Sequence, residues 1–449
     1  MDVILGLILS SILLIFSVAR GIDILVPLTL VLSIFTILAI KRGLTLKESL
    51  EVAYRGGKKS FIVLQIFVLI GAIISSWMAS GTVPAIVYYG INLISPSYFV
   101  ISAFILSALV SLLIGTSFGT IGTIGISLMV MARAGGGNLY AVAGAILSGA
   151  YFGDRCSPMS SSANLVANIT ETELYKNIRN MIKTSIIPLI IACIIYTLLS
   201  LKQPLDYSNS NIISEIVNYF NVSIVVLIPA FIIMVLSLFK VKVKTSMYIS
   251  MTTASLIAFF LQDYSFIEII KTLVFGFKLP EGNPLYSIIK GGGILSMIKL
   301  SLIVFMSSAL TGIFEGANML QFIQEPLNRI KRRDILFLST IGVSIVSAMV
   351  GCTQVLAVML TNMTMKSAYE KNNIDKYTLA TELENTAIVI APLIPWNVAV
   401  LVPLTNLQIG PKAILFSFYC ILIPIVNLVI IHLKSKVKTM NTIESNIGS

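Results

Sequence analysis

Charged and oxygen-bearing side chains gather between residues 150 and 168 of a chain that is otherwise mostly apolar. Asp154 and Arg155 directly follow an apolar run, and Pro158 predicts a helix break because proline lacks an N–H and clashes with the preceding turn. Neutral oxygens follow at Ser157, Ser160, Ser161, Ser162 and Asn164. Hard cations take oxygen ligands, and a carboxylate within an apolar segment is a functional hypothesis by default. The pattern predicts an ion or substrate site around Asp154, with a structural ion pair to Arg155 as the alternative.

A second interrupted segment, T-E-L-E-N-T-A-I-V-I-A-P-L-I-P-W-N, occupies residues 381–397. We expect Glu384 to be its site carboxylate because it lies closer to the apolar run than Glu382, which we interpret as a solvated charge at a helix start. The prolines at positions 392 and 395 free backbone carbonyls from helix bonding. Asn397 then adds an amide oxygen, and Trp396 is either a site residue or an interfacial anchor.

The segment G-T-S-F-G-T-I-G-T-I-G, residues 115–125, has two interpretations. Its glycines allow close helix packing, as small residues do in membranes. Alternatively, it is a re-entrant arm whose carbonyls and threonine hydroxyls face a cavity. Glu315, after a full apolar span, is either a third site group or an interfacial charge. The candidates for transport or gating roles are Thr116, Ser117, Thr120, Glu315, Thr386 and Trp396.

The composition identifies an all-α polytopic membrane protein. Of 449 residues, 56% are hydrophobic and 11% are charged, against about 25% charged in soluble domains, and the mean hydropathy is +0.94. Apolar runs of roughly 20 residues recur and predict about 10–14 spans or part-spans. The four cysteines have neither metal-ligand spacing nor a disulfide framework, so we expect them to be reduced.

The net charge of +11 comes from Lys and Arg in short connections between apolar runs. This distribution excludes nucleic acid as a partner and indicates the positive-inside bias of membrane proteins. We expect the loops at 41–59 and 329–333 to be cytoplasmic, with residues 44–59 along the membrane surface. The polar stretch 203–221 is the expected external loop.

The two interrupted segments belong to a candidate internal repeat. Gly115-Thr116-Ser117 ends one apolar span, and Gly351-Cys352-Thr353 ends another 236 positions later. The first of these spans is entered through a loop without Lys or Arg and the second through a basic loop, so the copies should cross in opposite directions. Inverted repeats with re-entrant hairpins or broken helices at the midplane are typical of secondary transporters. We expect six divisions. Residues 1–59 hold N-terminal spans and a cytoplasmic surface helix, 60–200 the first repeat, and 201–221 an external loop. Residues 222–330 hold further spans, 331–433 the second repeat, and 434–449 a cytoplasmic tail.

These motifs resemble those of the NhaC family of sodium/proton antiporters. G-D-R-C-S-P-M-S-S-S-A-N-L, from residue 153, resembles its G-D-K-x-S-P-L-S-D-T-T-N-L signature, and the segment at 381–397 resembles T-L-E-D-S-G-T-x-x-S-P-L-I-P-W-N. The resemblance implies inverted repeats with paired re-entrant hairpins. Two positions depart from the family: Ser161 and Asn385 stand where the signatures have aspartate. Each loss removes a negative charge that could bind Na⁺ or H⁺.

The resemblance implies a secondary active transporter, foremost a sodium/proton antiporter of the cytoplasmic membrane that works by alternating access. The alternative is a Na⁺- or H⁺-coupled exchanger of small organic acids or amino acids, because the family also includes such exchangers. An enzyme is not expected, since no His lies near the polar cluster and no metal set exists. We expect no cofactor beyond the transported Na⁺ and H⁺. The expected partners are membrane lipids and a small ion or acid, and a homodimer is left open. The predicted cation ligands are Asp154, Glu384, Ser157, Ser160, Ser161, Asn164 and Asn397.

Overall fold

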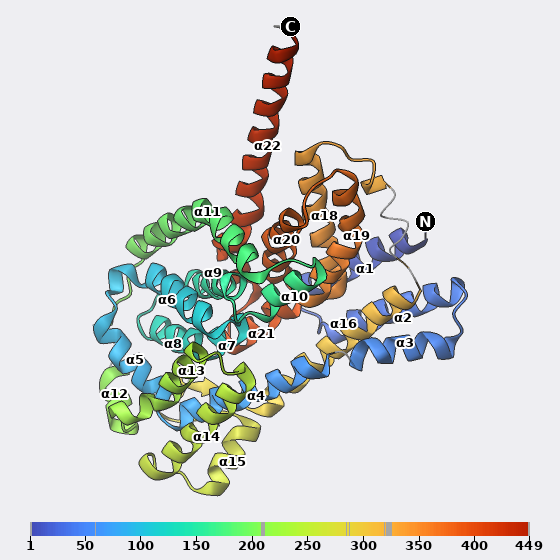
Figure 1. Ribbon diagram of the computed structural model, residues 1–449. Helices are drawn as coiled ribbons and strands as arrows, with labels where there is room; N and C mark the ends of the chain where they lie inside the picture. Colours follow the sequence, from blue (N-terminus) through green and yellow to red (C-terminus); the bar gives the residue numbers. More distant parts are fainter. Residues whose placement is uncertain are drawn as a thin grey trace.

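The computed structural model describes residues 2–58, 60–207, 212–283, 285–286, 288–317, 319 and 326–447. Helices form most of this part of the chain (Figure 1). The only strands in these ranges are the two-residue pair β1 (Phe277–Lys278) and β2 (Lys290–Gly291), which is antiparallel. The prediction of an all-α membrane protein is therefore confirmed.

The helices of the first half extend into the segment predicted as an external loop, where α12 lies. They are α1 (Asp2–Ala19), α2 (Leu25–Lys41), α3 (Leu46–Lys58), α4 (Phe61–Ala79), α5 (Thr82–Leu93), η1 (Pro96–Tyr98), α6 (Phe99–Ile114), α7 (Ser117–Thr120), the π-helix η2 (Ile121–Gly125), α8 (Ile126–Ala134), α9 (Leu139–Cys156), α10 (Ser161–Ile169), α11 (Leu174–Lys202) and α12 (Ile212–Tyr219).

The second half adds a helix that the apolar pattern did not predict, α15, and the short strand pair that follows it. Its helices are η3 (Ile224–Leu227), α13 (Ile228–Leu238), α14 (Val243–Leu261), α15 (Phe266–Phe275), η4 (Ile294–Met297), α16 (Ile298–Gly316), α18 (Arg333–Gly351), α19 (Gln354–Lys371), α20 (Lys376–Leu383), the π-helix η5 (Glu384–Ile388), η6 (Ala391–Leu393), α21 (Val398–Leu407), η7 (Pro411–Phe416) and α22 (Phe418–Ile447).

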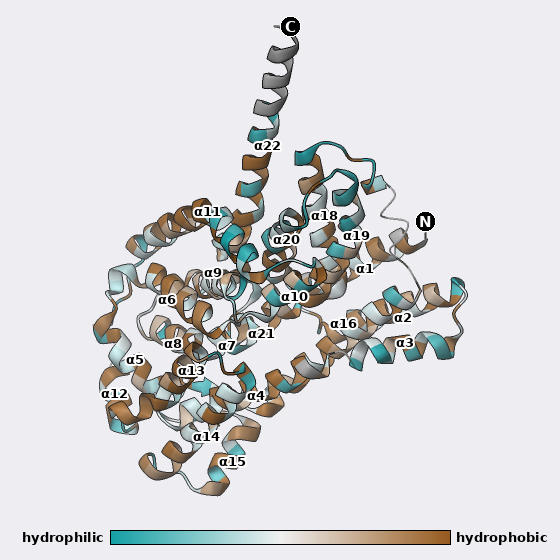
Figure 2. Cartoon of the chain, in the orientation of Figure 1, coloured by the Kyte–Doolittle hydropathy of each residue, from teal (hydrophilic) through white to brown (hydrophobic). Residues whose placement is uncertain are grey.

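The peripheral helices present apolar side chains outward, as a bilayer requires. In Figure 2, α5, α6, α11, α12 and α15 are mainly hydrophobic, and polar colour gathers around α10, α20 and the loops above α18 and α19. Among the described residues, six helices are long and apolar enough to cross a membrane, or up to nine if each of three bent helix pairs forms one span. Two shorter apolar helices lie at Leu5–Val18 and Leu25–Lys41. The chain is a multi-pass membrane protein.

Two helix breaks occur at matching places in the two halves. Helix α6 ends before Gly115 and α18 ends before Cys352, and both residues adopt the left-handed backbone conformation, with φ of 72° and 51°. An extended threonine follows each, Thr116 or Thr353, before the next helix begins. A Cβ on Gly115 would lie 2.6 Å from the Met159 carbonyl carbon, so this break also requires glycine for space.

The structure shifts the predicted register of the repeat by one residue. Gly115 matches Cys352 rather than Gly351, at an offset of 237 positions. Ser160 and Asn397, the N-caps of α10 and α21, have the same offset of 237. The capping role therefore belongs to a serine in the first copy and an asparagine in the second.

Helix α3 covers most of the segment predicted to lie along the membrane surface, and its place relative to the membrane stays a prediction. It packs along α16, and with α4 it forms a helix pair bent by 44° (Figure 1). Glycines allow the close approach: a Cβ on Gly312 would overlap the Val52 carbonyl oxygen and the Gly56 backbone. The amphipathic pattern of α3 therefore reflects one face packed on α16, a candidate span, and one charged face.

Candidate functional site

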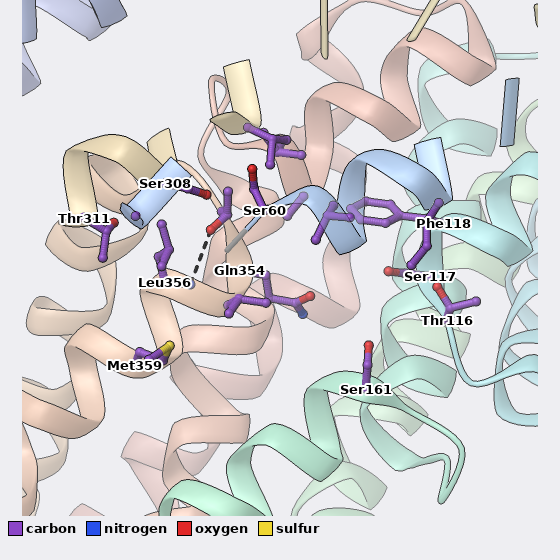
Figure 3. A pocket seen from close by; sticks show the side chains of 18 of the residues that line it. Ser60, Thr116, Ser117, Phe118, Ser161, Ser308, Thr311, Gln354, Leu356 and Met359 are labelled. Carbon is purple, nitrogen blue, oxygen red and sulfur yellow. Dashed lines mark hydrogen bonds between the residues drawn. The ribbon is translucent and has the colours of Figure 1, made fainter. Parts of the chain in front are cut away.

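A cavity of about 220 Å³ lies where the two helix breaks meet. Its walls come from the starts of α7, α10, α19 and α21, the end of α9, the α3–α4 junction and α16. Figure 3 shows Thr116, Ser117 and Phe118 on one side, Leu356, Met359 and Thr311 on the other, and Gln354 between them. Segments more than 200 positions apart in the sequence thus line one cavity, whose walls mix apolar side chains with hydroxyls and carboxylates.

Asp154 is the carboxylate of the first half that borders this cavity. It is 4% exposed, and its Oδ2 accepts a hydrogen bond from Ser117 Oγ at 3.0 Å. Its Oδ1 accepts from Ser160 Oγ at 2.8 Å and Ser162 Oγ at 3.4 Å. Because Ser160 and Ser162 begin α10, the partial positive charge of the helix N-terminus also faces the carboxylate. The helix break after Cys156 therefore holds the buried Asp154 carboxylate, surrounded by serine hydroxyls.

Arg155 points away from this carboxylate, although it is the next residue. It is fully buried, and its terminal nitrogens donate to Ser185 Oγ at 2.8 Å, Tyr419 Oη at 2.9 Å, Thr184 Oγ1 at 3.3 Å and Asn385 Oδ1. No ion pair joins Asp154 to Arg155 within the described ranges. The alternative of a structural ion pair between the two is therefore wrong.

Glu384 lies in the π-helix η5 and does not border the cavity. It is 1% exposed, and neither carboxylate oxygen has a hydrogen-bond partner among the described residues. The next residue, Asn385, bonds to Arg155, so Glu384 belongs to the same buried cluster. Thr386, two residues on, accepts from Ser344 Oγ at 2.9 Å and donates to the Glu382 carbonyl at 2.7 Å, and so fixes η5 against α18.

Glu382 is buried rather than solvated, which corrects the expectation for it. It is 4% exposed and accepts hydrogen bonds from Arg333 and from the Tyr369 hydroxyl. Arg333 begins α18, so the pair joins the start of the second repeat to its broken segment. This ion pair offsets the charge of Glu382 and leaves that group with a structural role.

The other predicted residues divide into cavity walls and hairpin braces. Thr116, Ser117, Ser161 and Glu315 border the cavity. The remaining side chains are absent from its walls and form hydrogen bonds within the breaks. In the first half, Ser157 Oγ accepts from Met159 N, Asn164 donates to the Pro158 and Ser160 carbonyls, and Thr120 donates to the Thr116 carbonyl. In the second half, Trp396 donates to the Met349 carbonyl, and Asn397 accepts from Ala399 N and donates to the Ala348 carbonyl.

Trp396 is 4% exposed, so its indole is inside the protein and not at an interface with lipid or water. The structure adds wall residues that the sequence did not indicate, namely Ser60, Ser308, Thr311 and Gln354. Of these, Gln354 follows the second break as Ser117 follows the first, so the corrected repeat register would have found it. Ser60, Ser308 and Thr311 carry no such signal, because they enter the cavity through packing of α3, α4 and α16.

The charges on the cavity walls are negative. Asp154 and Glu315 both border it, and no Lys, Arg or His does among the described residues, which leave out Lys59. The described ranges also contain no cluster of three His, Cys, Asp or Glu side chains that could hold a metal ion. Negative walls without a described basic side chain suit a cation or a proton better than an anion.

The family model described as the Na⁺/H⁺ antiporter family matches residues 2–162 and 149–434. The chain belongs to the Na⁺/H⁺ antiporter family. The resemblance to sodium/proton antiporters drawn from the motifs is therefore confirmed, and the protein is a member of a transporter family.

Curated relatives of this antiporter-family chain cover most of its length. An uncharacterized Na⁺/H⁺ antiporter of Haemophilus influenzae is 28% identical over 83% of this chain and 82% of its own. The malate-2H⁺/Na⁺-lactate antiporter of Bacillus subtilis is 28% identical over 88% of this chain and 86% of its own. The Na⁺/H⁺ antiporter NhaC of Alkalihalophilus pseudofirmus is 29% identical over 74% of this chain and 73% of its own.

Proposed function

We propose that the protein exchanges Na⁺ for H⁺ across the cytoplasmic membrane, with Asp154 as the group that binds either ion. The observation that carries this proposal is a buried carboxylate at the wall of an anionic cavity, between two helix breaks. A single carboxylate cannot hold a proton and coordinate Na⁺ at once. Competition between the two ions therefore couples their movements without a separate device.

The serine hydroxyls around Asp154 support both states of the carboxylate. Ser117 and Ser160 donate hydrogen bonds to it in the absence of a cation. A hydroxyl also carries two lone pairs and rotates freely, so the same oxygens can turn toward a cation. We propose Ser117, Ser160 and Ser161 as neutral ligands, and we assign Ser157, Asn164 and Asn397 to holding the breaks in shape.

The place of the cavity supports alternating access. The breaks before α7 and α19 and the starts of α10 and α21 all reach it, and they come from both copies of the repeat. A movement of one copy against the other would open the cavity to one side of the membrane at a time.

The cavity volume favours one second candidate, a Na⁺-coupled exchanger of small acids. Its 220 Å³ would hold several water molecules of about 30 Å³ each, and one relative is named for malate and lactate. The carboxylates of Asp154 and Glu315 oppose this candidate, because a substrate carboxylate would meet like charge with no basic partner described on the walls.

A transport survey in proteoliposomes would decide between these candidates. Purified protein would be given gradients of Na⁺, Li⁺, K⁺, malate, lactate, arginine or ornithine, and internal pH would be recorded. We expect Na⁺, and Li⁺ more weakly, to move protons, and the acids and amino acids to have no effect. Acid uptake that needs Na⁺, without Na⁺-driven proton flux in the absence of acid, would contradict the proposed function.

A further inference from the structure

Glu384 is the unusual carboxylate of the buried core. Asp154 has three hydroxyl partners and Glu382 has Arg333 and Tyr369, but no described residue donates a hydrogen bond to Glu384. A buried ionised carboxylate without partners is very costly, so such a group needs a counter-charge close by. Glu384 also lies outside the cavity walls, so a cation in the cavity is not that counter-charge.

Arg155 is the matching unusual cation. Its described hydrogen-bond partners, Ser185, Tyr419, Thr184 and Asn385, are all uncharged side chains. Its Nε is buried and has no acceptor among the described residues. The core thus holds a free donor on Arg155 and two free acceptors on Glu384. The hydrogen bond from Arg155 to Asn385, the residue after Glu384, brings the two charges near each other without a hydrogen bond between them.

We propose that Glu384 is the counter-charge of Arg155. Of the two buried acids without an ion-pair partner, Asp154 and Glu384, only Asp154 then exchanges Na⁺ for H⁺. This inference rests on the proposed function. With Asp154, Glu384 and Arg155 all ionised, the cluster carries one net negative charge. One Na⁺ or one H⁺ neutralises it, and a neutral cluster avoids the large cost of a net charge in a low-dielectric core. The exchange is therefore one Na⁺ for one H⁺ and electroneutral.

Asn385 provides the means to test this assignment. Its Oδ1 is bonded to Arg155, and it does not border the cavity. Asn385→Asp would therefore place a carboxylate directly on Arg155 and away from any cation in the cavity. Combined with Glu384→Gln, it moves the negative charge by one residue and keeps the net charge of the cluster unchanged.

The experiment measures the Na⁺ concentration that gives half-maximal proton flux in proteoliposomes. Glu384→Gln should raise it at least about tenfold, because Arg155 then repels the cation without compensation. The double variant Glu384→Gln/Asn385→Asp should return to within about threefold of wild type, and wild-type flux should not respond to an imposed membrane potential. A double variant as impaired as Glu384→Gln would show that Glu384 itself carries an ion, and a flux driven by potential would contradict electroneutral exchange.

A second pair of variants covers the case in which Glu384→Gln does not fold. Arg155→Gln and Glu384→Gln should each lower the yield of monodisperse protein, and the variant with both changes should recover most of it. Failure of the double change to recover yield would overturn the counter-charge assignment. If wild type shows no Na⁺-driven proton flux at all, the proposed function fails, and the yields of these variants still decide the pairing of Arg155 with Glu384.

Discussion

Position 161 and position 385 depart from the family signatures in the same way, by loss of an aspartate, but their surroundings differ. Ser161 begins α10 and borders the cavity, whereas Asn385 bonds to buried Arg155. An acid at 161 would face the transported ion, and an acid at 385 would pair with a fixed cation. The sequence alone cannot separate these roles, because Arg155 and Asn385 are 230 positions apart.

Ser161→Asp should therefore strengthen cation binding, since it adds a second carboxylate to the cavity beside Asp154. We expect the half-maximal Na⁺ concentration to fall about three- to tenfold, as one added charge at this range predicts. Asn168→Asp is the matched control, because it adds the same charge to an exposed position of α10 that is absent from the cavity walls. An equal effect of both variants would show that the cause is surface charge and not a cation ligand.

The sequence identified Asp154 correctly as a buried group, because a carboxylate within an apolar run is costly to bury and therefore marks a site. It failed for Glu382, since a charge near the predicted end of a span looks solvated until its partner is known. That partner, Arg333, lies 49 positions earlier and is placed there by the packing of α18 on α20.

Among the elements, the two breaks and the helices that follow them were predictable from Gly, Pro and clustered hydroxyls. The exact register was not, because the left-handed residue of the second copy is Cys352 and not the glycine before it. The packing of α3 was also missed. A polar, amphipathic helix has the same pattern whether its apolar face meets lipid or another helix.

The crossing of α3 and α16 gives a prediction for stability. Gly312→Ala should lower the melting temperature of the purified protein measurably, because its Cβ would overlap the Val52 carbonyl and force the helices apart, at a cost of about 1–3 kcal/mol. Gly342→Ala in α18 is the control, since nothing lies within 4 Å of a Cβ there. Thermal unfolding in detergent measures both, and equal melting temperatures would mean that the crossing is not tightly packed.

For the whole molecule, the cavity unites parts that no local pattern relates. Its walls include Ser60, Ser308 and Thr311 from helices whose sequences indicate only membrane spans. Sequence reasoning could predict two halves with a broken segment each, but not which further helices would close the site between them. The charged loops predict the orientation of the two halves in the membrane.

Cysteine labelling would test that orientation. In a variant without the four native cysteines, Lys331→Cys should be protected from an impermeant reagent in intact cells and react in everted vesicles. Asn218→Cys, exposed on α12, should show the reverse, because it lies in the predicted external segment. Labelling of Lys331→Cys in intact cells would contradict the predicted topology and, with it, the opposite crossing of the two repeat copies.

The central claim is that Na⁺ and H⁺ compete for Asp154, and proton release on Na⁺ binding measures this directly. Purified protein would be titrated with Na⁺ in two buffers of different ionisation enthalpy, and the protons released per bound Na⁺ would be derived from calorimetry. Wild type and the exposed control Asp263→Asn should release about one proton per Na⁺, at a pH where the carboxylate is protonated before binding. Asp154→Asn should bind little Na⁺ and release none. Undiminished proton release by Asp154→Asn would contradict the account.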